Sequence, residues 1–230
     1  MAKADEPYNP LDKYNLAKSI RNEILSRDPI LLATDLKLRG AGVYAIYYVG
    51  DFAPYEKISD ANANSKFSMP IYVGKAIPKG GRKGGIIEKS GSGRSLSDRL
   101  GQHAKSIQEA QNINLSQFYF RHLVVDDIWI PLGENALISE FNPLWNAAID
   151  GFGNKDPGRR RATQYKSPWD VLHPGRDFAE KLADSSLTPS FLEQRVYDFL
   201  NGRKMAKLPK TIAEALEGEQ AEVEAAADEA

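Results

Sequence analysis

The chain has 230 residues, a length that suits one substantial domain with terminal additions. Hydrophobic residues make up 42% and charged residues 27%, so an ordinary globular core can form. The sequence contains no cysteine, which excludes disulfide frameworks, cysteine–zinc sites and cysteine nucleophiles. The first ten residues do not resemble a signal peptide, and no apolar run approaches the ~18 residues that span a bilayer. We therefore expect a cytoplasmic protein without a membrane segment.

The formal net charge of -1 hides an uneven distribution along the chain. Residues 211–230 contain seven acidic residues and neither Lys nor Arg, so the other residues have 30 basic against 24 acidic side chains, a formal charge of +6. A basic body attracts polyanions through its summed electrostatic field. A solvated basic surface would give the same modest charge, so the charge alone does not decide between these interpretations.

The first half of the chain predicts a helix followed by two strands. Leu16, Ile20 and Ile24 recur at helical spacing. The later segments GVYAIYYV and PIYVG are rich in β-branched and aromatic residues, which are typical of strands. The expected elements are, in order, a helix over 11–25, a strand over 42–49, a polar excursion over 50–69, a strand over 70–74 and a long loop over 76–94 that is rich in Gly and Lys.

The second half predicts further helices and one more strand. Ser95 suits the N-cap of a helix because Asp98 follows three residues later, and Pro131 suits the first turn of another. The expected elements are a helix over 96–110, a strand over 118–125, a helix over 134–140 and two helices over 177–182 and 190–200. Together the elements predict an α+β fold, built on a small antiparallel three-stranded sheet flanked by helices, with N- and C-terminal helical additions.

Five polar side chains on these elements are candidates for chemistry. Arg99 and His103 stand four residues apart, so both project from one face of the predicted helix. Glu134 lies near the start of a helix, where an acid can either favour the helix dipole or bind a hard cation such as Mg²⁺. Tyr44 and Tyr72 lie on neighbouring predicted strands. Each feature has an ordinary structural explanation when it is taken alone.

Two basic loops surround these candidates. The stretch from residue 75 to 105 holds eight Lys or Arg against two acids, and its glycines allow close approach to a backbone. The G-K-[ST] ending of a Walker loop is missing. Basic loops beside a carboxylate suit a phosphodiester substrate better than a neutral metabolite. The expected DNA contacts are Lys79, Arg82, Lys83, Arg94, Asn154, Arg159, Arg160 and Arg161.

These residues together resemble the ordered signature of GIY-YIG nucleases over residues 40–150. The segments MPIYVGKA, PLWNAAIDGFGN and SPWDVLHPGRDFAEK extend the similarity to about residue 182 and are similar to restriction endonucleases of the SacII specificity group, which cut CCGCGG. Both signature isoleucines are Val here, which a strand tolerates. The matching elements are Gly42-Val43-Tyr44, Tyr72-Val73-Gly74, Arg99 with His103, Glu134 and Asn146.

The resemblance implies a type II restriction endonuclease that hydrolyses double-stranded DNA with Mg²⁺, for which Mn²⁺ can substitute. It also implies a homodimer on a GC-rich palindrome such as CCGCGG and a cognate DNA methyltransferase as partner. The implied domains are an N-terminal helical extension (1–39), a nuclease core (40–150) with an insertion at 50–69, a DNA-binding loop with C-terminal helices (151–205), and an acidic, disordered tail (206–230).

The resemblance supports the positions of these residues in a site, and we hypothesise their individual roles. Glu134 would bind the metal, Tyr44 would orient and deprotonate the attacking water, and nearby cations would favour the Tyr44 phenolate. Either Tyr44 or His103 would be the final proton acceptor. The candidate catalytic residues are Tyr44, Tyr72, Lys75, Arg99, His103, Glu134 and Asn146.

Two alternatives remain open at this point. One is a repair or homing nuclease of the same superfamily, which the long gap between Tyr44 and Tyr72 disfavours because that gap matches the restriction branch. The other is a non-catalytic DNA-binding protein on a nuclease scaffold. His122 and His173 are weaker candidates, and no chemical role can be given to either.

Overall fold

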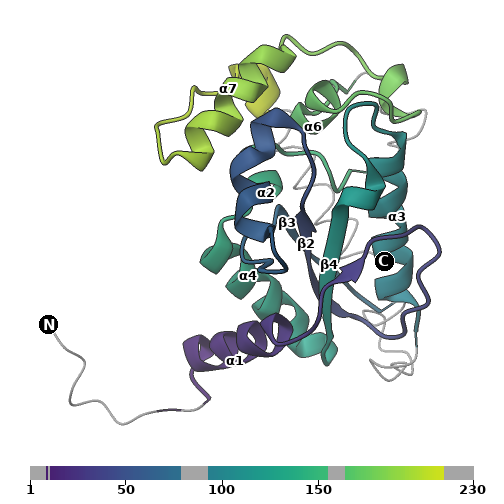
Figure 1. Cartoon of the computed structure of the whole chain (residues 1–230), viewed down its shortest axis with the longest axis vertical. Coiled ribbons are helices and arrows are strands. Elements are labelled where there is room, and N and C mark those ends of the chain that lie inside the picture. The colour runs from purple at the N-terminus through teal and green to yellow at the C-terminus, as the bar shows by residue number, and fades with distance from the viewer. Residues whose placement is uncertain (1–8, 10, 79–92, 155–163, 215–230) are drawn as a thin grey trace, which may run out of the picture.

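A four-stranded antiparallel sheet forms the centre of the computed structural model, which describes residue 9 and residues 11–78, 93–154 and 164–214 (Figure 1). The strand order is β1-β4-β2-β3, so the prediction of a three-stranded sheet is wrong. The additional strand, β1, has only two residues and lies at the edge beside β4, too short for an alternating pattern to reveal it. The strands are β1 (Ile30–Leu31), β2 (Gly42–Tyr48), β3 (Tyr72–Ala76) and β4 (Phe118–Val124).

The helices confirm most of the sequence prediction. Ser95 is, however, the first residue of its helix and not its N-cap, and residues 177–182 contain only one 3-10 turn. The short helices at residues 56–62, 144–147 and 168–172 were not predicted. Within the described ranges, no helix is both long and apolar enough to cross a membrane. The α-helices are α1 (Lys13–Leu25), α2 (Glu56–Asn62), α3 (Ser95–Glu109), α4 (Ile130–Phe141), α5 (Leu144–Ala147), α6 (Pro168–Leu172) and α7 (Pro189–Leu200), and the 3-10 turns are η1 (Ala53–Tyr55), η2 (Leu115–Gln117), η3 (Asp127–Trp129) and η5 (Ala179–Lys181).

The central strand β2 is buried on both of its faces. Because side chains alternate along a strand, Tyr44, Ile46 and Tyr48 point to one side, where they share a hydrophobic core with α3. Val43 and Tyr47 point to the other side, where they share a second core with α1 and α4. Figure 1 shows α3 on one side of the sheet and α4 on the other. Tyr44 is therefore held between the sheet and α3.

The outer edge of β3 is closed by the chain segment at α5. The backbone N–H of Val73 donates to Oδ1 of Asn146 at 2.8 Å, and Nδ2 of Asn146 donates to the Val73 carbonyl at 2.9 Å. The Trp145 N–H also donates to the Ile71 carbonyl at 2.9 Å. An edge strand otherwise leaves such groups unpaired. The Asn146 side chain thus takes the place of a neighbouring strand.

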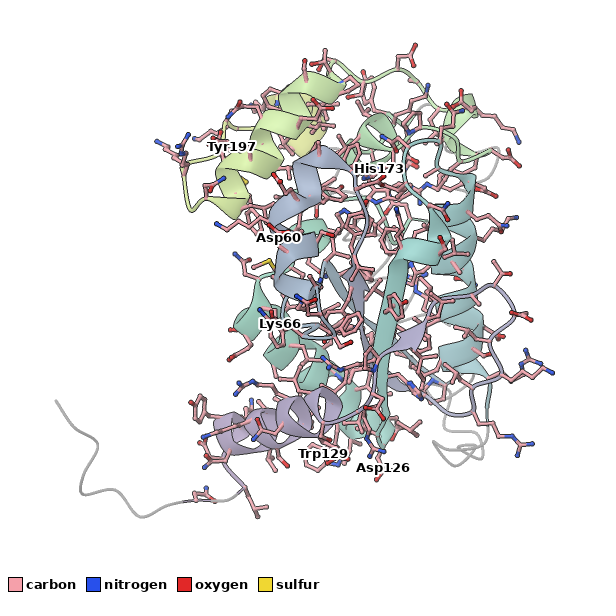
Figure 2. The ribbon with its side chains drawn as sticks, viewed as in Figure 1. Asp60, Lys66, Asp126, Trp129, His173 and Tyr197 are labelled. Carbon is pink, nitrogen blue, oxygen red and sulfur yellow. The ribbon has the colours of Figure 1, made fainter. Side chains whose placement is uncertain are left out.

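A chain of buried hydrogen bonds ties the insertion to the C-terminal half of the domain. His173 lies in the interior beside α6 (Figure 2) and shares hydrogen bonds with the Tyr55 hydroxyl at 2.5 Å and with Oδ1 of Asn112 at 2.8 Å. The Trp145 indole N–H donates to the same Tyr55 hydroxyl at 2.9 Å. Burial, aided by the charge of Arg176, lowers the pKa of His173 to about 3. His173 is therefore a neutral core residue.

The folded body extends beyond the boundary expected at residue 206. Ile212 is buried, and Leu208 packs against the same hydrophobic core as α7. These contacts remove the apolar side chains of Ile212 and Leu208 from water. The remaining part of the expected acidic tail, residues 215–230, lies outside the described residues.

We expect Asn146→Asp to lower the free energy of unfolding by about 1–3 kcal/mol, because a carboxylate cannot donate to the Val73 carbonyl and leaves that edge group unpaired. Urea denaturation followed by tryptophan fluorescence measures this change. The control is Asn201→Asp, which removes a similar amide-to-carbonyl bond to Tyr197 on an exposed surface and should cost less than about 1 kcal/mol. Equal losses in the two variants would contradict the role given to Asn146.

The low pKa of His173 predicts a loss of stability in acid. Because the folded pKa of about 3 lies below the ordinary value of 6.5, the unfolded chain binds the proton first. The contribution of neutral His173 to the free energy of unfolding is fully present above pH 6.5. It falls by about 1.4 kcal/mol per pH unit as the pH drops towards 3. Urea titrations at several pH values should give a shallower acid slope for His173→Gln than for the wild type. A slope unchanged by His173→Gln but flattened by His122→Gln would be the opposite result.

Candidate active site

A buried tyrosine–histidine pair lies between the sheet and α3. The Tyr44 hydroxyl on β2 is 2.7 Å from Nε2 of His103, whose side chain is buried on α3. Gly74 of β3 stands directly opposite Tyr44 in the sheet. A Cβ atom at this position would overlap the Tyr44 hydroxyl, so only glycine leaves room for the ring. The third residue of the second signature triplet therefore makes space for the first tyrosine.

Tyr72 and Arg99 complete the cluster on this face. The Tyr72 ring on β3 is centred 6.4 Å from the Tyr44 ring and 5.1 Å from the His103 ring. Arg99 lies one helical turn before His103, and its charge and hydrogen bonding act on both tyrosine hydroxyls. The structure thus brings four sequence-predicted residues together, as the helical spacing of the α3 pair indicated.

The electrostatics of Tyr44 differ from the sequence expectation. Burial raises the pKa of Tyr44 well above its ordinary value of 10.0, and the neighbouring Tyr72 raises it further. Arg99 lowers this pKa, but by less than burial raises it. Burial also raises the pKa of Tyr72. Arg99 thus favours the Tyr44 phenolate, as expected, but desolvation of the charged form outweighs the attraction of Arg99.

Glu134 and Lys75 lie on the other side of the sheet. Lys75 pairs with Val43 in the register, so it points away from the Tyr44 face and towards α4. Its Nζ atom is 2.7 Å from Oε2 of Glu134, whose side chain is 16% exposed. The Glu134 charge still raises the pKa of Tyr44 and Tyr72. The cluster therefore reaches around the edge strand β3 and includes groups from both faces.

Glu134 is the carboxylate that fits a divalent cation in this cluster. Among the described residues, no group of three or more His, Cys, Asp or Glu side chains could hold a metal. Mg²⁺ does not require such a group, because it keeps several waters and takes one or two protein carboxylates together with substrate phosphate. A single, partly exposed Glu134 is compatible with this chemistry, and a cation there would compete with Lys75 for the carboxylate.

The other predicted residues fall into three groups. Asn146 binds the backbone of Val73 and supports β3 from outside, as described above. Arg94 lies at the start of α3 with a side chain that is 72% exposed, and Asn154 follows a turn beside the cluster. The predicted DNA contacts Lys79, Arg82, Lys83, Arg159, Arg160 and Arg161 lie outside the described residues.

The turn at residues 151–154 contributes groups that the sequence prediction missed. The Phe152 ring stacks on the His103 ring, with centroids 4.5 Å apart and planes 17° apart. The Gly153 carbonyl accepts a hydrogen bond from Nη2 of Arg99 at 3.3 Å. The Gly-Phe-Gly-Asn sequence was a signal for a tight turn, but its contact with Arg99 and His103 depends on the tertiary fold.

A cleft of about 350 Å³ opens beside this turn and reaches two residues of the cluster, Arg99 and His103. It runs between α3 and the segments around residues 152–154 and 177–181. Both Arg99 and His103 form part of its wall, so a substrate in the cleft can reach them. Basic side chains also line it, at Lys105 and Lys181, together with the acids Glu109 and Asp177.

Comparison with known families agrees with this geometry. A model of the Eco29kI GIY-YIG domain matches residues 36–200, a range that includes every residue of the cluster. A comparison with curated proteins gives no match. The resemblance to GIY-YIG restriction enzymes is thereby confirmed. Since the match spans most of the 230 residues, the chain belongs to the Eco29kI GIY-YIG family of restriction endonucleases, and its domain is that of a DNA endonuclease.

Proposed function

We propose that the chain is a type II restriction endonuclease that hydrolyses phosphodiesters of double-stranded DNA at a specific site, with Mg²⁺ as cofactor and Mn²⁺ as a substitute. The observation that carries this proposal is the 2.7 Å contact between the Tyr44 hydroxyl and His103 Nε2. The Tyr44–His103 pair lies beside the Arg99 guanidinium, and the Glu134 carboxylate lies on the other side of the sheet, next to β3. Metal-assisted hydrolysis of a phosphodiester uses a proton acceptor, a cation and a metal ligand, and the cluster contains a candidate for each.

The raised pKa of Tyr44 favours a proton relay over a free phenolate. Tyr44 takes a proton from the attacking water while its own hydroxyl proton passes to His103 Nε2. The water oxygen bonds to phosphorus as the bond from phosphorus to the leaving oxygen breaks. Because the two proton transfers occur together, negative charge does not accumulate on the buried phenol. His103 is then the final acceptor of the proton.

Cationic and neutral donors would hold the phosphate during this step. Arg99 presents a planar fork of donors that suits phosphate oxygens and the charge that develops on them. Tyr72 lies beside Arg99 and positions the same phosphate. Glu134 would hold Mg²⁺, which supplies Lewis-acid stabilisation of the phosphate and the leaving oxygen. Lys75 keeps the Glu134 carboxylate paired when the cation is absent.

The proposed target is a GC-rich palindrome such as CCGCGG. Support comes from the similarity of PLWNAAIDGFGN and SPWDVLHPGRDFAEK to the restriction branch with that specificity. One cluster of this kind cuts one strand, so a two-fold symmetric site requires two copies of the chain. We therefore propose a homodimer on DNA. A cognate DNA methyltransferase is the expected partner, because a host with such a nuclease must protect its own sites.

We expect Glu134→Gln to lower the rate of DNA cleavage at least about 100-fold, because the neutral amide is a poor ligand for Mg²⁺. The measurement is digestion of unmethylated plasmid with Mg²⁺, beside a reaction with EDTA. Glu140→Gln is the matched control: Glu140 lies on the same helix, is exposed and pairs with Arg21, so this variant should cut normally.

The fragments from this digestion test the rest of the proposal. Discrete fragments that disappear with EDTA and with Glu134→Gln support a site-specific, metal-dependent nuclease, and sequencing their ends identifies the site. DNA that is bound but stays intact, both unmethylated and methylated, would instead indicate a non-catalytic DNA-binding protein. Random degradation would contradict the site-specific assignment alone.

Tyr44→Phe should reduce single-turnover cleavage about 100-fold or more and leave DNA affinity in Ca²⁺ within about threefold, because only the proton-transferring hydroxyl is removed. Tyr47→Phe is the control. Tyr47 lies on the opposite face of the same strand, where its hydroxyl accepts a hydrogen bond from Arg121 at 3.2 Å. If both variants lose the same small factor, the Tyr44 hydroxyl does not take part in the reaction.

A further inference from the structure

We propose that the buried ion pair of Arg176 and Asp170 positions Arg99 and His103 for the reaction, through the turn at residues 151–154. This inference rests on the nuclease function proposed above and assigns a role to the segment SPWDVLHPGR, for which the sequence offered no chemistry. Arg176 and Asp170 are positioning residues: their contacts reach the cluster only through the turn.

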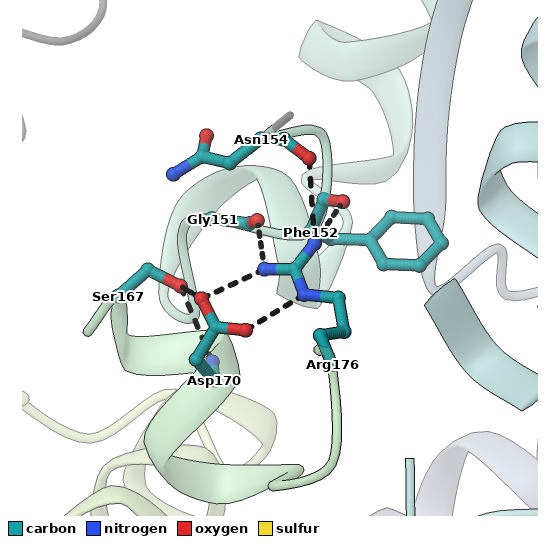
Figure 3. A network of polar contacts seen from close by, with 6 residues as sticks. All are labelled: Gly151, Phe152, Asn154, Ser167, Asp170 and Arg176. Carbon is teal, nitrogen blue, oxygen red and sulfur yellow. Dashed lines mark hydrogen bonds and ion pairs between the residues drawn. The ribbon is translucent and has the colours of Figure 1, made fainter. Parts of the chain in front are cut away.

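The Arg176 guanidinium donates hydrogen bonds both to the turn and to the Asp170 carboxylate (Figure 3). Its Nε and Nη2 atoms donate to the two oxygens of Asp170 at 2.7 and 2.8 Å. Nη2 also donates to the Gly151 carbonyl at 2.9 Å, and Nη1 donates to the carbonyls of Phe152 and Asn154 at 3.2 and 3.4 Å. The side chains of Arg176 and Asp170 are 0% and 2% exposed. Three carbonyls of one turn are therefore fixed by one buried side chain.

Packing and a further hydrogen bond hold the ion pair in place. The Ser167 hydroxyl donates to Oδ2 of Asp170 at 2.6 Å, and the same hydroxyl caps the N-terminus of α6. The guanidinium carbon of Arg176 lies 4.5 Å from the centre of the Trp169 ring and 4.7 Å from that of Phe178. Such stacking orients a guanidinium. The ion pair thus has little freedom to move relative to α6.

The other side of the turn contacts the cluster. Phe152 stacks on His103 with centroids 4.5 Å apart, and the Gly153 carbonyl accepts from Arg99. A Cβ atom at Gly153 would lie only 3.2 Å from both Nη2 of Arg99 and the Tyr72 hydroxyl. Gly151 has φ +105°, and a Cβ there would overlap the Ser167 side chain. The turn is therefore packed tightly between the ion pair and the cluster, and a shift on one side is transmitted to the other.

The turn affects the two residues in different ways. The Phe152 ring covers one face of the His103 imidazole and fixes its plane, which keeps Nε2 directed at the Tyr44 hydroxyl. The Gly153 carbonyl holds one nitrogen of Arg99, so the other donors of the fork can point to the tyrosines and the phosphate. A displaced turn would misplace both groups without removing either of them.

A second buried arginine provides a matched control. Arg121 on β4 donates to the carbonyls of Arg27 and Phe67 and to the Tyr47 hydroxyl. Its side chain joins the core on the opposite face of the sheet from Tyr44. Replacing either arginine with lysine keeps a buried positive charge but removes the planar guanidinium and its several N–H donors. Both variants lose hydrogen bonds from a buried guanidinium to backbone carbonyls, but only Arg176→Lys should disturb the turn at residues 151–154.

The first experiment compares Arg176→Lys and Arg121→Lys in the full chain. At matched fractions of folded protein, Arg176→Lys should cut target DNA about 10- to 100-fold more slowly in a single turnover, while its affinity for the DNA in Ca²⁺ stays within about threefold. Arg121→Lys should cut at nearly the wild-type rate. Equal losses of rate in the two variants would show a merely structural role and overturn the proposal.

The second experiment does not depend on cleavage, so it separates this proposal from the nuclease function. The chain has three histidines, which makes assignment of the His103 ring signals in an NMR spectrum tractable. Stacking on Phe152 should place these signals upfield. Arg176→Lys should move them towards the positions of a free imidazole, whereas Arg121→Lys should leave them unchanged. Unmoved His103 signals in folded Arg176→Lys would overturn the proposal, even if the wild type cuts DNA as expected.

Phe152→Leu keeps the proposal testable if Arg176→Lys does not fold. This variant removes the ring over His103 but leaves the carbonyl that Arg176 holds. The imidazole can then rotate away from the Tyr44 hydroxyl, so the single-turnover rate should fall and the His103 ring signals should move downfield. A wild-type rate and unmoved His103 signals in Phe152→Leu would overturn the proposal.

Discussion

Buried polar groups must find hydrogen-bond partners, and this constraint affects the arrangement of the elements more than any single hydrophobic contact does. Leaving a donor or acceptor unpaired away from water costs about as much as several good packing contacts provide. Three such pairings are central to the fold. The Tyr44 hydroxyl is hydrogen-bonded to His103, and the Val73 backbone is hydrogen-bonded to the Asn146 amide. The Arg176 guanidinium is hydrogen-bonded to the Asp170 carboxylate. The first two pairings join residues 59 and 73 positions apart in the chain, and Arg176, whose partner Asp170 is six positions away, also binds the more distant carbonyls of Gly151 and Phe152. The polar contacts thus determine how the hydrophobic layers are placed relative to one another.

The edge strand β3 is where these contacts meet. An interior strand has neighbours on both sides, whereas β3 pairs only with β2 and leaves its outer edge for Asn146 and the Trp145 backbone. Because its side chains alternate, Tyr72 joins the α3 face while Lys75 joins the α4 face. An edge position therefore lets one short strand contribute to a cluster that contains groups from both sides of the sheet.

Burial also explains the chemistry that the cluster favours. Desolvation raises the pKa of Tyr44 beyond what Arg99 can compensate, so a mechanism through a free phenolate would work against the fold. The same desolvation lowers the pKa of His173, which is neutral in a purely structural network. Tyr55 with His173 and Tyr44 with His103 are thus similar pairs in different surroundings. Arg176 lies near the first pair and Arg99 near the second, but the cleft beside the turn is lined by His103 and not by Tyr55 or His173.

The main strands, most of the long helices and the residues of the central cluster could all be predicted from the sequence. Local patterns carry that information: helical spacing places Arg99 and His103 on one face, and β-branched and aromatic runs place Tyr44 and Tyr72 on strands. Residues of the basic loops were identified by charge alone, and most of them lie outside the described structure.

The register of the strands, the edge strand β1 and the surroundings of the site could not be predicted, because they depend on tertiary contacts. Gly74 makes room for Tyr44 because the two stand opposite each other across β2 and β3, and no local pattern encodes that pairing. The pKa of Tyr44 follows from the depth of its burial, which depends on how α3 packs on the sheet. The bonds from Arg176 to the turn carbonyls join residues more than 20 positions apart. Such long-range contacts have no periodicity, so they emerge only when the chain is folded.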